Sequence, residues 1–500
     1  MSWISFLSQQ AKKQPDKTAI IDQNQSKSYS YDQINHLSNR WASFLKTNGV
    51  QKGDRVTLLC TNSSEHLLIF FGAAKLGAVF VPLNFRLANK ELQKIVKKID
   101  PKISFGFGPA PFPIGNTYID LNALVLPETE SAFDAESDAS QALLMLFTSG
   151  STGEPKGVIL HEQMLLSNIE NTIKSWGLCH SDITILETPF FHTGGYNVLC
   201  LPLLFLGGTV VLAKGFAAEN VLNTIEKEKI SVYFGVPTMF QMISEHPNFE
   251  ITNFSSLRFF ISGGAACGVE LIKKYQQKGL MFKQGFGLTE VGPNCFLLEE
   301  KDAVRKAGSI GKPMPHSNVL VINSKGQVCG PQQAGELLIK GPHLCAGYFK
   351  DEKRFKDSLL DGYFKTGDQV LFDDEGFYYV VGRIKDMYIS GGENVFPGEV
   401  EKELKTHAQI DEAVVVSVPD SKWGEVGWAF IQSNQKFDVD SIRNYLNLHL
   451  SRYKHPQYVE NIQQWPLLPN GKIDRKKLKS LALSQFDSCL NLISTKDLDL

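Results

Sequence analysis

A run of ten residues after an apolar stretch has the composition of a phosphate-binding loop. The apolar stretch is 143–147, and the run is Thr148, Ser149, Gly150, Ser151, Thr152, Gly153, Glu154, Pro155, Lys156 and Gly157. Backbone N–H groups and hydroxyls in such a loop can point toward one anion, and a lysine adds positive charge. Because Lys156 is followed by glycine, the run differs from a Walker A loop, which requires Gly-Lys-Ser/Thr. It therefore predicts a phosphate site of another kind, with a plain Ser/Gly turn as the alternative.

The stretch 147–158, with the sequence FTSGSTGEPKGV, resembles the signature loop of the AMP-forming acyl-CoA synthetases, which are adenylate-forming enzymes. Other segments that resemble this family's motifs follow in the family's order and extend to residue 475. A shared order over this length is more specific than any single motif. The resemblance implies an acid–thiol ligase that uses ATP, Mg²⁺ and CoA.

The resemblance implies three nucleotide-binding segments. The run at 148–156 would hold phosphate, and the segments 262–266 and 285–290 would contact adenine and the α-phosphate. Phe286 stands where the family usually has tyrosine, so its ring can stack on adenine but the hydroxyl is lost. Glycines in such turns allow a flat ring to approach the backbone. The implied nucleotide-binding residues are Thr148, Ser149, Gly150, Ser151, Thr152, Gly153, Lys156, Gly263, Gly264, Ala265, Gly285, Phe286 and Gly287.

The segment 285–290 also supplies implied catalytic residues, within what we expect to be a glycine loop. Thr289 would contact the α-phosphate and Glu290 would hold Mg²⁺. This fits the preference of Mg²⁺ for carboxylate oxygen together with substrate phosphates. Read without the resemblance, a Thr-Glu pair here would predict a helix cap.

Two segments nearer the C-terminus carry the implied ribose site and hinge. Asp368, at the end of YFKTGD, would accept both ribose hydroxyls. Arg383, in GRIKD, would join it at the ribose and a nearby phosphate oxygen. Lys385 occupies the family's hinge position, where backbone torsions absorb a domain rotation. A surface ion pair is the alternative for Arg383.

The last two motifs divide the reaction between two steps. Gly391 and Gly392 would let the pantetheine arm of CoA pass, with a simple β-turn as the alternative. Lys472 follows an Asn-Gly turn signal and would reach the carboxylate oxygen and the α-phosphate during adenylation. Since Lys476 and Lys477 stand nearby, a solvated lysine is the alternative reading.

The class of carboxylic acid substrate is predicted from less specific sequence features. His192, in PFFHTGG, would border the acyl pocket and lie near the substrate carboxylate, although a histidine beside phenylalanine is more often a packed core residue. The expected lining at 192–196, 233–237, 263–265 and 286–293 is apolar and small, without lysine or arginine. This favours a medium- or long-chain fatty acid, with an aryl acid or succinylbenzoate as alternatives.

The elements that must position these residues indicate an α/β fold. Apolar runs such as 55–60, 78–81 and 209–213 alternate with helical patterns at 66–76 and 218–229, which is typical of mostly parallel, helix-covered sheets. From about 308 the strands shorten and glycine and proline become frequent, which predicts a barrel-like β subdomain at 308–384. After 384 a small α+β pattern begins. We therefore expect an N-terminal domain at 1–384 and a mobile C-terminal domain at 385–500.

Composition excludes several classes of protein. The chain has 500 residues, 43% hydrophobic and 21% charged, as globular proteins do. Its 51 basic and 53 acidic residues give a net charge of −2, so no basic excess suggests a nucleic-acid partner. We expect no secretory signal and no transmembrane segment. Eight dispersed cysteines predict reduced thiols in a cytoplasmic protein. Whether the chain forms a homodimer, or associates peripherally with a membrane, is left open.

Three rival functions remain at this stage. An acyl-AMP ligase could deliver the acyl group to a carrier protein, but only 14 residues separate Asp368 from Arg383, too few for the insertion such ligases often carry. A luciferase-like oxygenase would also form an acyl-AMP. A binding protein without catalysis would not need Lys156, Glu290 and Lys472 together.

Overall fold

The computed structural model of the chain describes residues 5–114, 117–128, 133, 138–148, 155–265, 267–390, 393–420, 422–468 and 472–496. These residues form two compact units. The first contains Met1–Leu320, Leu338–Thr366 and Glu375–Tyr378, and the second contains Val321–Leu337, Gly367–Asp374 and Tyr379–Leu500. The dividing line passes through β16 (Asn318–Ile322), β17 (Gly335–Lys340), β20 (Tyr363–Phe372) and β21 (Tyr378–Arg383). The predicted domain boundary after residue 384 remains a prediction.

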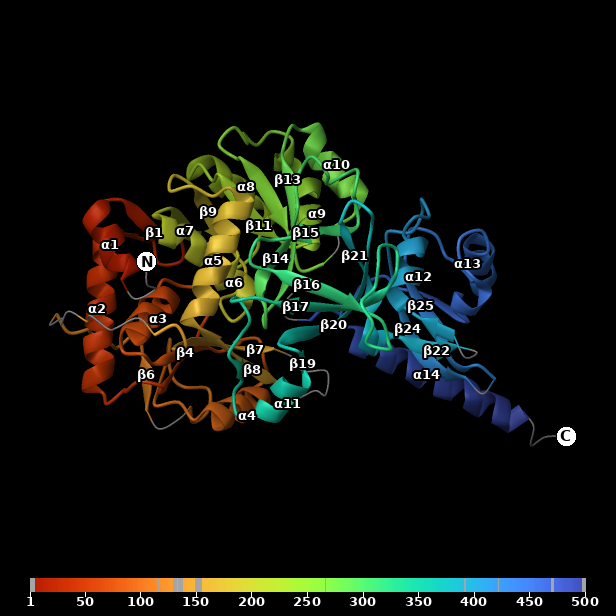
Figure 1. Cartoon of the computed structure of the whole chain (residues 1–500), viewed down its shortest axis with the longest axis horizontal. Helices are drawn as coiled ribbons and strands as arrows, with labels where there is room; N and C mark the ends of the chain where they lie inside the picture. The colour runs from red at the N-terminus through yellow and green to blue at the C-terminus, as the bar shows by residue number, and fades with distance from the viewer. Residues whose placement is uncertain are drawn as a thin grey trace. The chain divides into compact units, whose positions relative to one another are not determined.

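A seven-stranded sheet lies in the first unit (Figure 1). Its order is β18 (Gly347–Tyr348), β8 (Lys156–His161), β7 (Ala142–Thr148), β4 (Val79–Pro82), β3 (Arg55–Leu59), β5 (Ile103–Gly106) and β6 (Tyr118–Asp120). The strands from β7 to β6 run parallel, whereas β8 and β18 are antiparallel additions. Helix α4 (Asn89–Ile99) buries Leu92, Ile95, Val96 and Ile99, and this spacing puts one apolar face on the sheet.

A four-stranded sheet completes the N-terminal part of this unit. Its order is β2 (Lys27–Ser30), β1 (Thr18–Asp22), β10 (Thr209–Leu212) and β9 (Ile183–Leu186). The helices of this region are α1 (Phe6–Lys13), α2 (Tyr31–Thr47), α3 (Glu65–Lys75), α5 (Glu162–Trp176), α6 (Thr193–Asn197) and α7 (Cys200–Leu206). Helix α3 is buried on nearly all sides, so its apolar sequence makes it a core helix.

A third group of strands supports most of the predicted nucleotide segments. Parallel strands β11 (Val232–Gly235), β12 (Phe259–Ser262) and β13 (Phe282–Leu288) lead into antiparallel β14 (Gly292–Leu298) and β15 (Ser309–Pro313). Figure 1 shows α8 (Ala218–Lys227), α9 (Pro237–Glu245) and α10 (Val269–Gln277) around β11–β13. Aromatic rings of Tyr233, Phe240, Phe260, Tyr275 and Phe282 meet edge to face in the core between them.

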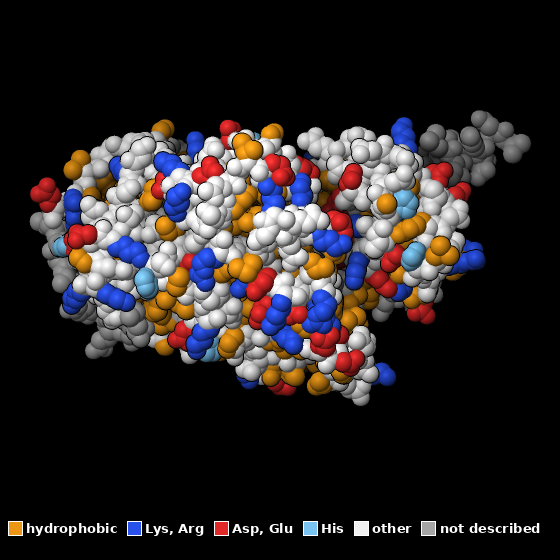
Figure 2. Space-filling model, turned by 90° about the horizontal axis from the view of Figure 1, so that it is seen from above, with side chains coloured by type: hydrophobic (Ala, Val, Ile, Leu, Met, Phe, Trp, Pro, Cys, Tyr) orange, Lys and Arg blue, Asp and Glu red, His pale blue; other side chains and the backbone are white. Residues whose placement is uncertain are grey.

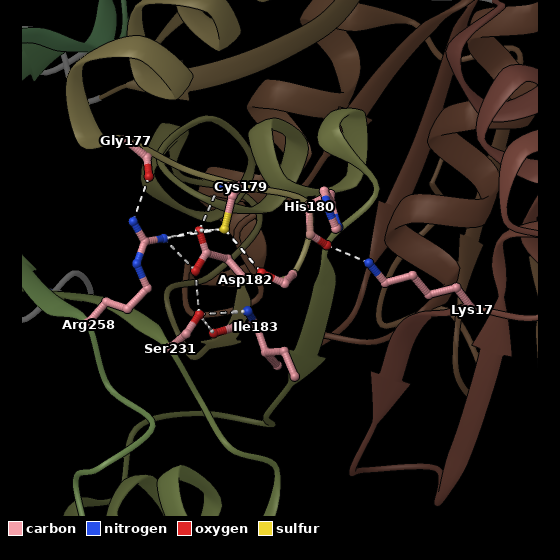
Figure 3. Close-up of polar contacts among 9 residues, drawn as sticks. Lys17, Gly177, Cys179, His180, Asp182, Ile183, Ser231 and Arg258 are labelled. Atoms are coloured by element: carbon pink, nitrogen blue, oxygen red, sulfur yellow. Dashed lines mark hydrogen bonds and ion pairs between the residues drawn. The ribbon is translucent and has the colours of Figure 1, made fainter.

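An ion pair between Arg258 and the buried Asp182 joins the starts of three strands (Figure 3). Asp182, just before β9, is 1% exposed and accepts hydrogen bonds at 2.6–2.8 Å from the Arg258 guanidinium, the Ser231 hydroxyl and the Cys179 N–H. Arg258 also donates to the Gly177 carbonyl at the end of α5, at 2.8 Å. Burial alone would raise the pKa of Asp182, but these donors outweigh it and lower the pKa.

The C-terminal part of the second unit is an α+β sandwich. Its strands are β22 (Tyr388–Ser390), β23 (Glu393–Val395), β24 (Glu412–Asp420), β25 (Gly424–Gln432) and β26 (Tyr458–Asn461). Alternate residues of β24 face opposite sides. Ala413 and Val415 pack with α12 (Pro397–Leu404) and α13 (Val439–Leu446), whereas Val414 and Val416 pack with α14 (Arg475–Lys496).

The distribution of surface charge and the state of the described cysteines agree with what the composition predicts. Basic and acidic side chains are interspersed on the face shown in Figure 2. The seven cysteines that the structure describes are all free thiols, and five of them are buried. No helix within the described ranges is long and apolar enough to cross a membrane.

Most predicted elements are confirmed, and one local prediction is wrong. Strands β3 and β10 lie within the predicted runs 55–60 and 209–213, and the α/β alternation and small C-terminal α+β region are present. The segment 285–288, expected as a glycine loop, is instead part of β13. The reason is that Gly285, Phe286 and Leu288 of β13 pair with β14, with a register shift between Phe286 and Leu288, and this pairing overrides the weak strand preference of glycine.

Candidate active site

The β7–β8 hairpin presents the predicted phosphate-binding run. The two strands pair antiparallel from Ala142↔His161 to Thr148↔Lys156, so both ends of the run lie side by side. The Thr148 hydroxyl is buried and has no hydrogen-bond partner among the described residues. Residues Ser149, Gly150, Ser151, Thr152 and Gly153 lie outside the described residues.

Lys156, Glu290 and Tyr348 form a compact polar cluster at the loop end of this hairpin. Lys156 Nζ lies 2.9 Å from Glu290 Oε1, and the side chains are 17% and 10% exposed. Tyr348 Oη lies 3.0 Å from both atoms. The structure thus brings together two predicted site residues that are 134 positions apart in sequence. Tyr348 was missed, because nothing in the sequence marks it among 14 tyrosines.

Two of the predicted nucleotide-binding glycines also have a packing reason to be glycine. A Cβ at Gly285 would meet the Trp176 ring at 2.9 Å, and one at Gly287 would meet backbone of Gly292 and Pro293 at 2.3 Å. Such contacts with backbone cannot be relieved by side-chain movement. Phe286 packs edge-on against Phe296 with ring centroids 5.7 Å apart. Thr289 and Glu290 follow directly, in the turn between β13 and β14.

The predicted adenine turn follows strand β12. Gly264 has φ +82°, a conformation that side chains other than glycine rarely adopt, and both Gly264 and Ala265 are exposed. A Cβ at Gly263 would meet the Phe234 ring at 3.1 Å. On the other side of the same ring, a Cβ at Gly194 would lie 3.3 Å away. Phe234 therefore stands between the adenine turn and the segment that contains His192.

Residues in and just before helix α3 contact the segment around His192 through hydrogen bonds and ring stacking. Asn62, 3% exposed, donates to the Thr188 carbonyl at 3.0 Å and accepts from the Phe190 N–H at 3.1 Å. The His66 ring stacks on Phe190 at 4.9 Å. His192 itself precedes α6, with its ring 4.5 Å from that of Phe191. Asn62 was missed because its partners are 126 and 128 residues away.

Arg86 lies near the segment around His192, although the expected lining of the acid pocket contains no lysine or arginine. The Arg86 guanidinium lies over the rings of Phe85 and Phe191, 5.5 and 6.0 Å from their centroids. Arg86 is exposed and comes from the turn after β4, which sequence reasoning did not assign to the acid site.

The second unit holds the predicted ribose residues. Asp368 lies on the buried face of β20 and is 1% exposed, and its Oδ1 is 2.5 Å from Arg383 Nε. Burial raises the pKa of Asp368 to about 6, although the charges of Arg383, Lys472 and Lys385 act in the opposite direction. Lys385 is the middle residue of a 3₁₀ turn, Ile384–Asp386.

Lys472 belongs to the same group of charges. A bridge between Leu467 and Ile473 and a 2.7 Å bond from the Leu468 N–H to the Lys472 carbonyl fix its backbone. Lys472 remains partly in solvent, but neighbouring atoms displace water from the ammonium and, with the Arg383 charge, lower its pKa, while Asp368 raises it. Asp368, Arg383 and Lys472 are therefore close enough to influence one another. Gly391 and Gly392 lie outside the described residues, between the paired strands β22 and β23.

The donor set fits Mg²⁺ only in partnership with a phosphate. Among the residues that the structure describes, no group of three His, Cys, Asp or Glu side chains could hold a metal ion. Glu290 is a single, mostly buried carboxylate beside the phosphate-binding run, and Mg²⁺ commonly takes one carboxylate together with substrate phosphates. Glu290 therefore suits the ion when a nucleotide is bound.

Known proteins of similar sequence and structure cover nearly the whole chain. The family model of the AMP-binding enzyme matches residues 7–349, and that of the AMP-binding enzyme C-terminal domain matches 399–472. A feruloyl-CoA synthase of an Amycolatopsis species is 35% identical over 471 residues, which are 93% of this chain and 95% of that protein. A long-chain-fatty-acid–CoA ligase of Mycobacterium tuberculosis, FadD13, is 33% identical over 499 residues, 97% of this chain and 98% of that protein.

A solved structure gives the same assignment. The o-succinylbenzoate CoA synthetase of Bacillus subtilis, in complex with ATP and magnesium ion, has a TM-score of 0.85 and 28% identity. The match covers 95% of this chain and 99% of that chain. The chain belongs to the AMP-binding enzyme family and, within it, to the AMP-forming carboxylate–CoA ligases.

Proposed function

We propose that the chain activates an apolar monocarboxylic acid, with a medium- or long-chain fatty acid as the first candidate, and transfers the acyl group to CoA. An enzyme of this class consumes ATP and CoA and uses Mg²⁺. The observation that carries the acid assignment is the contact of Phe234 with Gly194 and Gly263, which makes an apolar wall beside the adenine turn. We also propose a cytoplasmic location, which the free cysteines support.

In the first step, the acid carboxylate attacks the α-phosphate of ATP, and acyl-AMP and pyrophosphate form. We assign phosphate binding to Lys156 and the run at 148–153, adenine binding to 263–265 and 285–287, and ribose binding to Asp368 and Arg383. Thr289 would donate to the α-phosphate and His192 would orient the acid. Lys472 would donate to the carboxylate and α-phosphate oxygens, where negative charge increases in the transition state. Mg²⁺ held by Glu290 would neutralise phosphate charge.

In the second step, the CoA thiol attacks the acyl carbonyl and AMP leaves. We assign the passage for pantetheine to Gly391 and Gly392, and the hinge to Lys385. A rotation there would exchange the Lys472 motif for the Gly391–Gly392 motif, so that each serves one half-reaction.

A second candidate, an aromatic acid, is favoured by the ring chemistry around the acid segment. Phe234, Phe191 and Phe85 present flat faces or edges, which aromatic substrates can contact at low entropic cost. The feruloyl-CoA synthase relative supports the same candidate. Arg86 lies beside Phe191 and could pair with a second carboxylate, so a dicarboxylic acid such as succinylbenzoate is included in the test.

Pyrophosphate release over a panel of acids tests the proposal directly. The panel contains fatty acids of graded length, benzoates, cinnamates and succinylbenzoate, each with and without CoA. We expect sustained release only with CoA and a medium- or long-chain fatty acid. Turnover with cinnamates alone would replace the first candidate by the second. A single burst that CoA does not alter would indicate a carrier-protein acceptor.

The Asp368 carboxyl predicts how ATP affinity changes with pH. Only the ionised carboxylate accepts two ribose hydroxyls fully, and burial raises its pKa to about 6. We expect KM for ATP to rise as the pH falls below about 6, by up to tenfold per unit. Measurement of KM at about pH 5 to 8 tests this, and Asp368→Asn should give a high KM without this pH dependence. A wild-type KM that stays constant over the range would contradict the assignment.

Substitution of the hinge residue should separate the two half-reactions. Proline fixes φ, so Lys385→Pro would prevent the change in φ at the middle residue of the 3₁₀ turn. We expect pyrophosphate release to continue and thioester formation to fall at least tenfold. Lys385→Ala, which keeps the torsional freedom, is the control. An unimpaired second step in the proline variant would show that residue 385 is not the hinge.

A further inference from the structure

The Lys156–Glu290 pair shares a third residue that the reaction scheme above does not use. We propose that Tyr348 is a positioning residue for Mg-ATP, whose hydroxyl holds the Lys156 ammonium and the Glu290 carboxylate in their working positions. This inference rests on the phosphate and Mg²⁺ roles proposed for those two residues.

The direction of each hydrogen bond follows from the chemistry of the groups. A lysine ammonium can only donate, and an ionised carboxylate can only accept. Tyr348 Oη therefore accepts from Lys156 Nζ and gives its one proton to Glu290 Oε1, both at 3.0 Å. A hydroxyl can serve both groups at once, whereas phenylalanine can serve neither.

The ring of Tyr348 adds a contact that is independent of its hydroxyl. Lys156 Nζ lies 4.5 Å from the ring centroid, a cation–π distance. The Phe355 ring also packs against the Tyr348 ring in an edge-to-face arrangement, with centroids 5.4 Å apart. Removal of the hydroxyl alone should therefore leave the packing of the ring intact.

The backbone around Tyr348 is tied to both elements of the cluster. Strand β18 pairs with the strand that begins at Lys156, with Tyr348 opposite Val158. The Cys345 N–H donates to the Glu290 carbonyl at 2.8 Å. Tyr348 is thus fixed relative to the hairpin and to the β13–β14 turn, which a positioning residue requires.

The contacts define what must happen when nucleotide binds. Lys156 and Glu290 now neutralise one another, but a phosphate would attract the ammonium and Mg²⁺ would attract the carboxylate. As the two separate, each still has the Tyr348 hydroxyl as a neighbour. Without that hydroxyl, both charges would lose a fixed partner at the moment they exchange ligands, and Mg-ATP would bind more weakly.

Tyr348→Phe tests the inference by binding, without any need for the acid. In calorimetric titrations, we expect the Kd for Mg-ATP to rise about tenfold, since charge-assisted hydrogen bonds are lost. For metal-free ATP the rise should be smaller, because Glu290 then has no metal to hold. In turnover, KM for Mg-ATP should rise while KM for the acid stays within twofold of wild type.

Tyr275→Phe is a matched control. It deletes a buried phenol that donates to the Phe240 carbonyl at 2.8 Å, in the same unit but away from the cluster. It should lower the melting temperature without a change in Mg-ATP binding. Unchanged Mg-ATP binding in Tyr348→Phe, or equal loss of acid and nucleotide affinity, would overturn the inference. Normal Mg-ATP binding by wild type without pyrophosphate release from any acid would overturn the proposed function instead.

Discussion

Lys472→Ala is expected to slow acyl-AMP formation by about a hundred- to a thousandfold, because one donor to the developing negative charge is removed. The position of Lys472 beside Asp368 and Arg383 supports this role, since those residues are assigned to the ribose and an adjoining phosphate oxygen. The second half-reaction should survive. With synthetic acyl-AMP and CoA supplied, we expect thioester formation within about threefold of the wild-type rate.

The two half-reactions must be measured separately for this test. Pyrophosphate release reports the first, and consumption of added acyl-AMP reports the second. Lys476→Ala, which removes an exposed lysine from the start of α14, is the control and should leave both rates unchanged. Equal loss of both steps in Lys472→Ala would contradict the division of roles.

Asp182→Asn should destabilise the first unit by about 2 kcal/mol, because the Arg258 guanidinium, which is 41% exposed, loses the buried carboxylate that accepts its hydrogen bonds. Asparagine has nearly the same shape but offers one acceptor oxygen where the carboxylate offers two, and its NH₂ would face the donors of Arg258, Ser231 or Cys179. The midpoint of urea denaturation, followed by tryptophan fluorescence, measures the loss. Glu270→Gln is the control: both side chains of its ion pair with Lys273 are exposed, so we expect little change.

The sign of the pH dependence follows from the lowered pKa of Asp182. A depressed pKa stabilises the fold while the group is ionised, at all pH values above its unfolded pKa. That stabilisation is lost as the pH falls toward the lower pKa of the folded state. The difference in stability between wild type and Asp182→Asn should therefore shrink on acidification below about pH 4. A difference that grows at low pH would exclude an ion-pair origin.

Local sequence patterns predicted the fold well where an element's own residues determine it. The alternation through β3, α3 and β4 follows from residue periodicity and turn residues. The strand conformation of segment 285–288 was not predicted, because it depends on pairing with β14 and on space beside Trp176. Because glycine has no side chain, its presence in the sequence does not indicate which tertiary contacts surround it.

In the candidate site, too, residues within sequence motifs were predicted, whereas residues that act through long-range contacts were not. The family's motif order pointed to Lys156, Glu290, Asp368 and Arg383, and the structure pairs them as Lys156 with Glu290 and Asp368 with Arg383. Tyr348 and Asn62 act through contacts made across 58 to 192 residues, so no local pattern marks them. Arg86 likewise approaches Phe191 only through the fold. The roles of all these residues remain predictions for experiment.

Burial of the cysteines has a practical consequence for how this enzyme can be assayed. Burial raises the pKa of the Cys60, Cys267 and Cys345 thiols to about 12, so they will react slowly with disulfide reagents near neutral pH. Cys179 is only half-buried, with Sγ 3.6 Å from Arg258 Nη1, so it is more open to modification than the five described cysteines that are buried. In colorimetric titration of unconsumed CoA, the buried thiols among the described residues should therefore add little background, and Cys179→Ser should lower the background further.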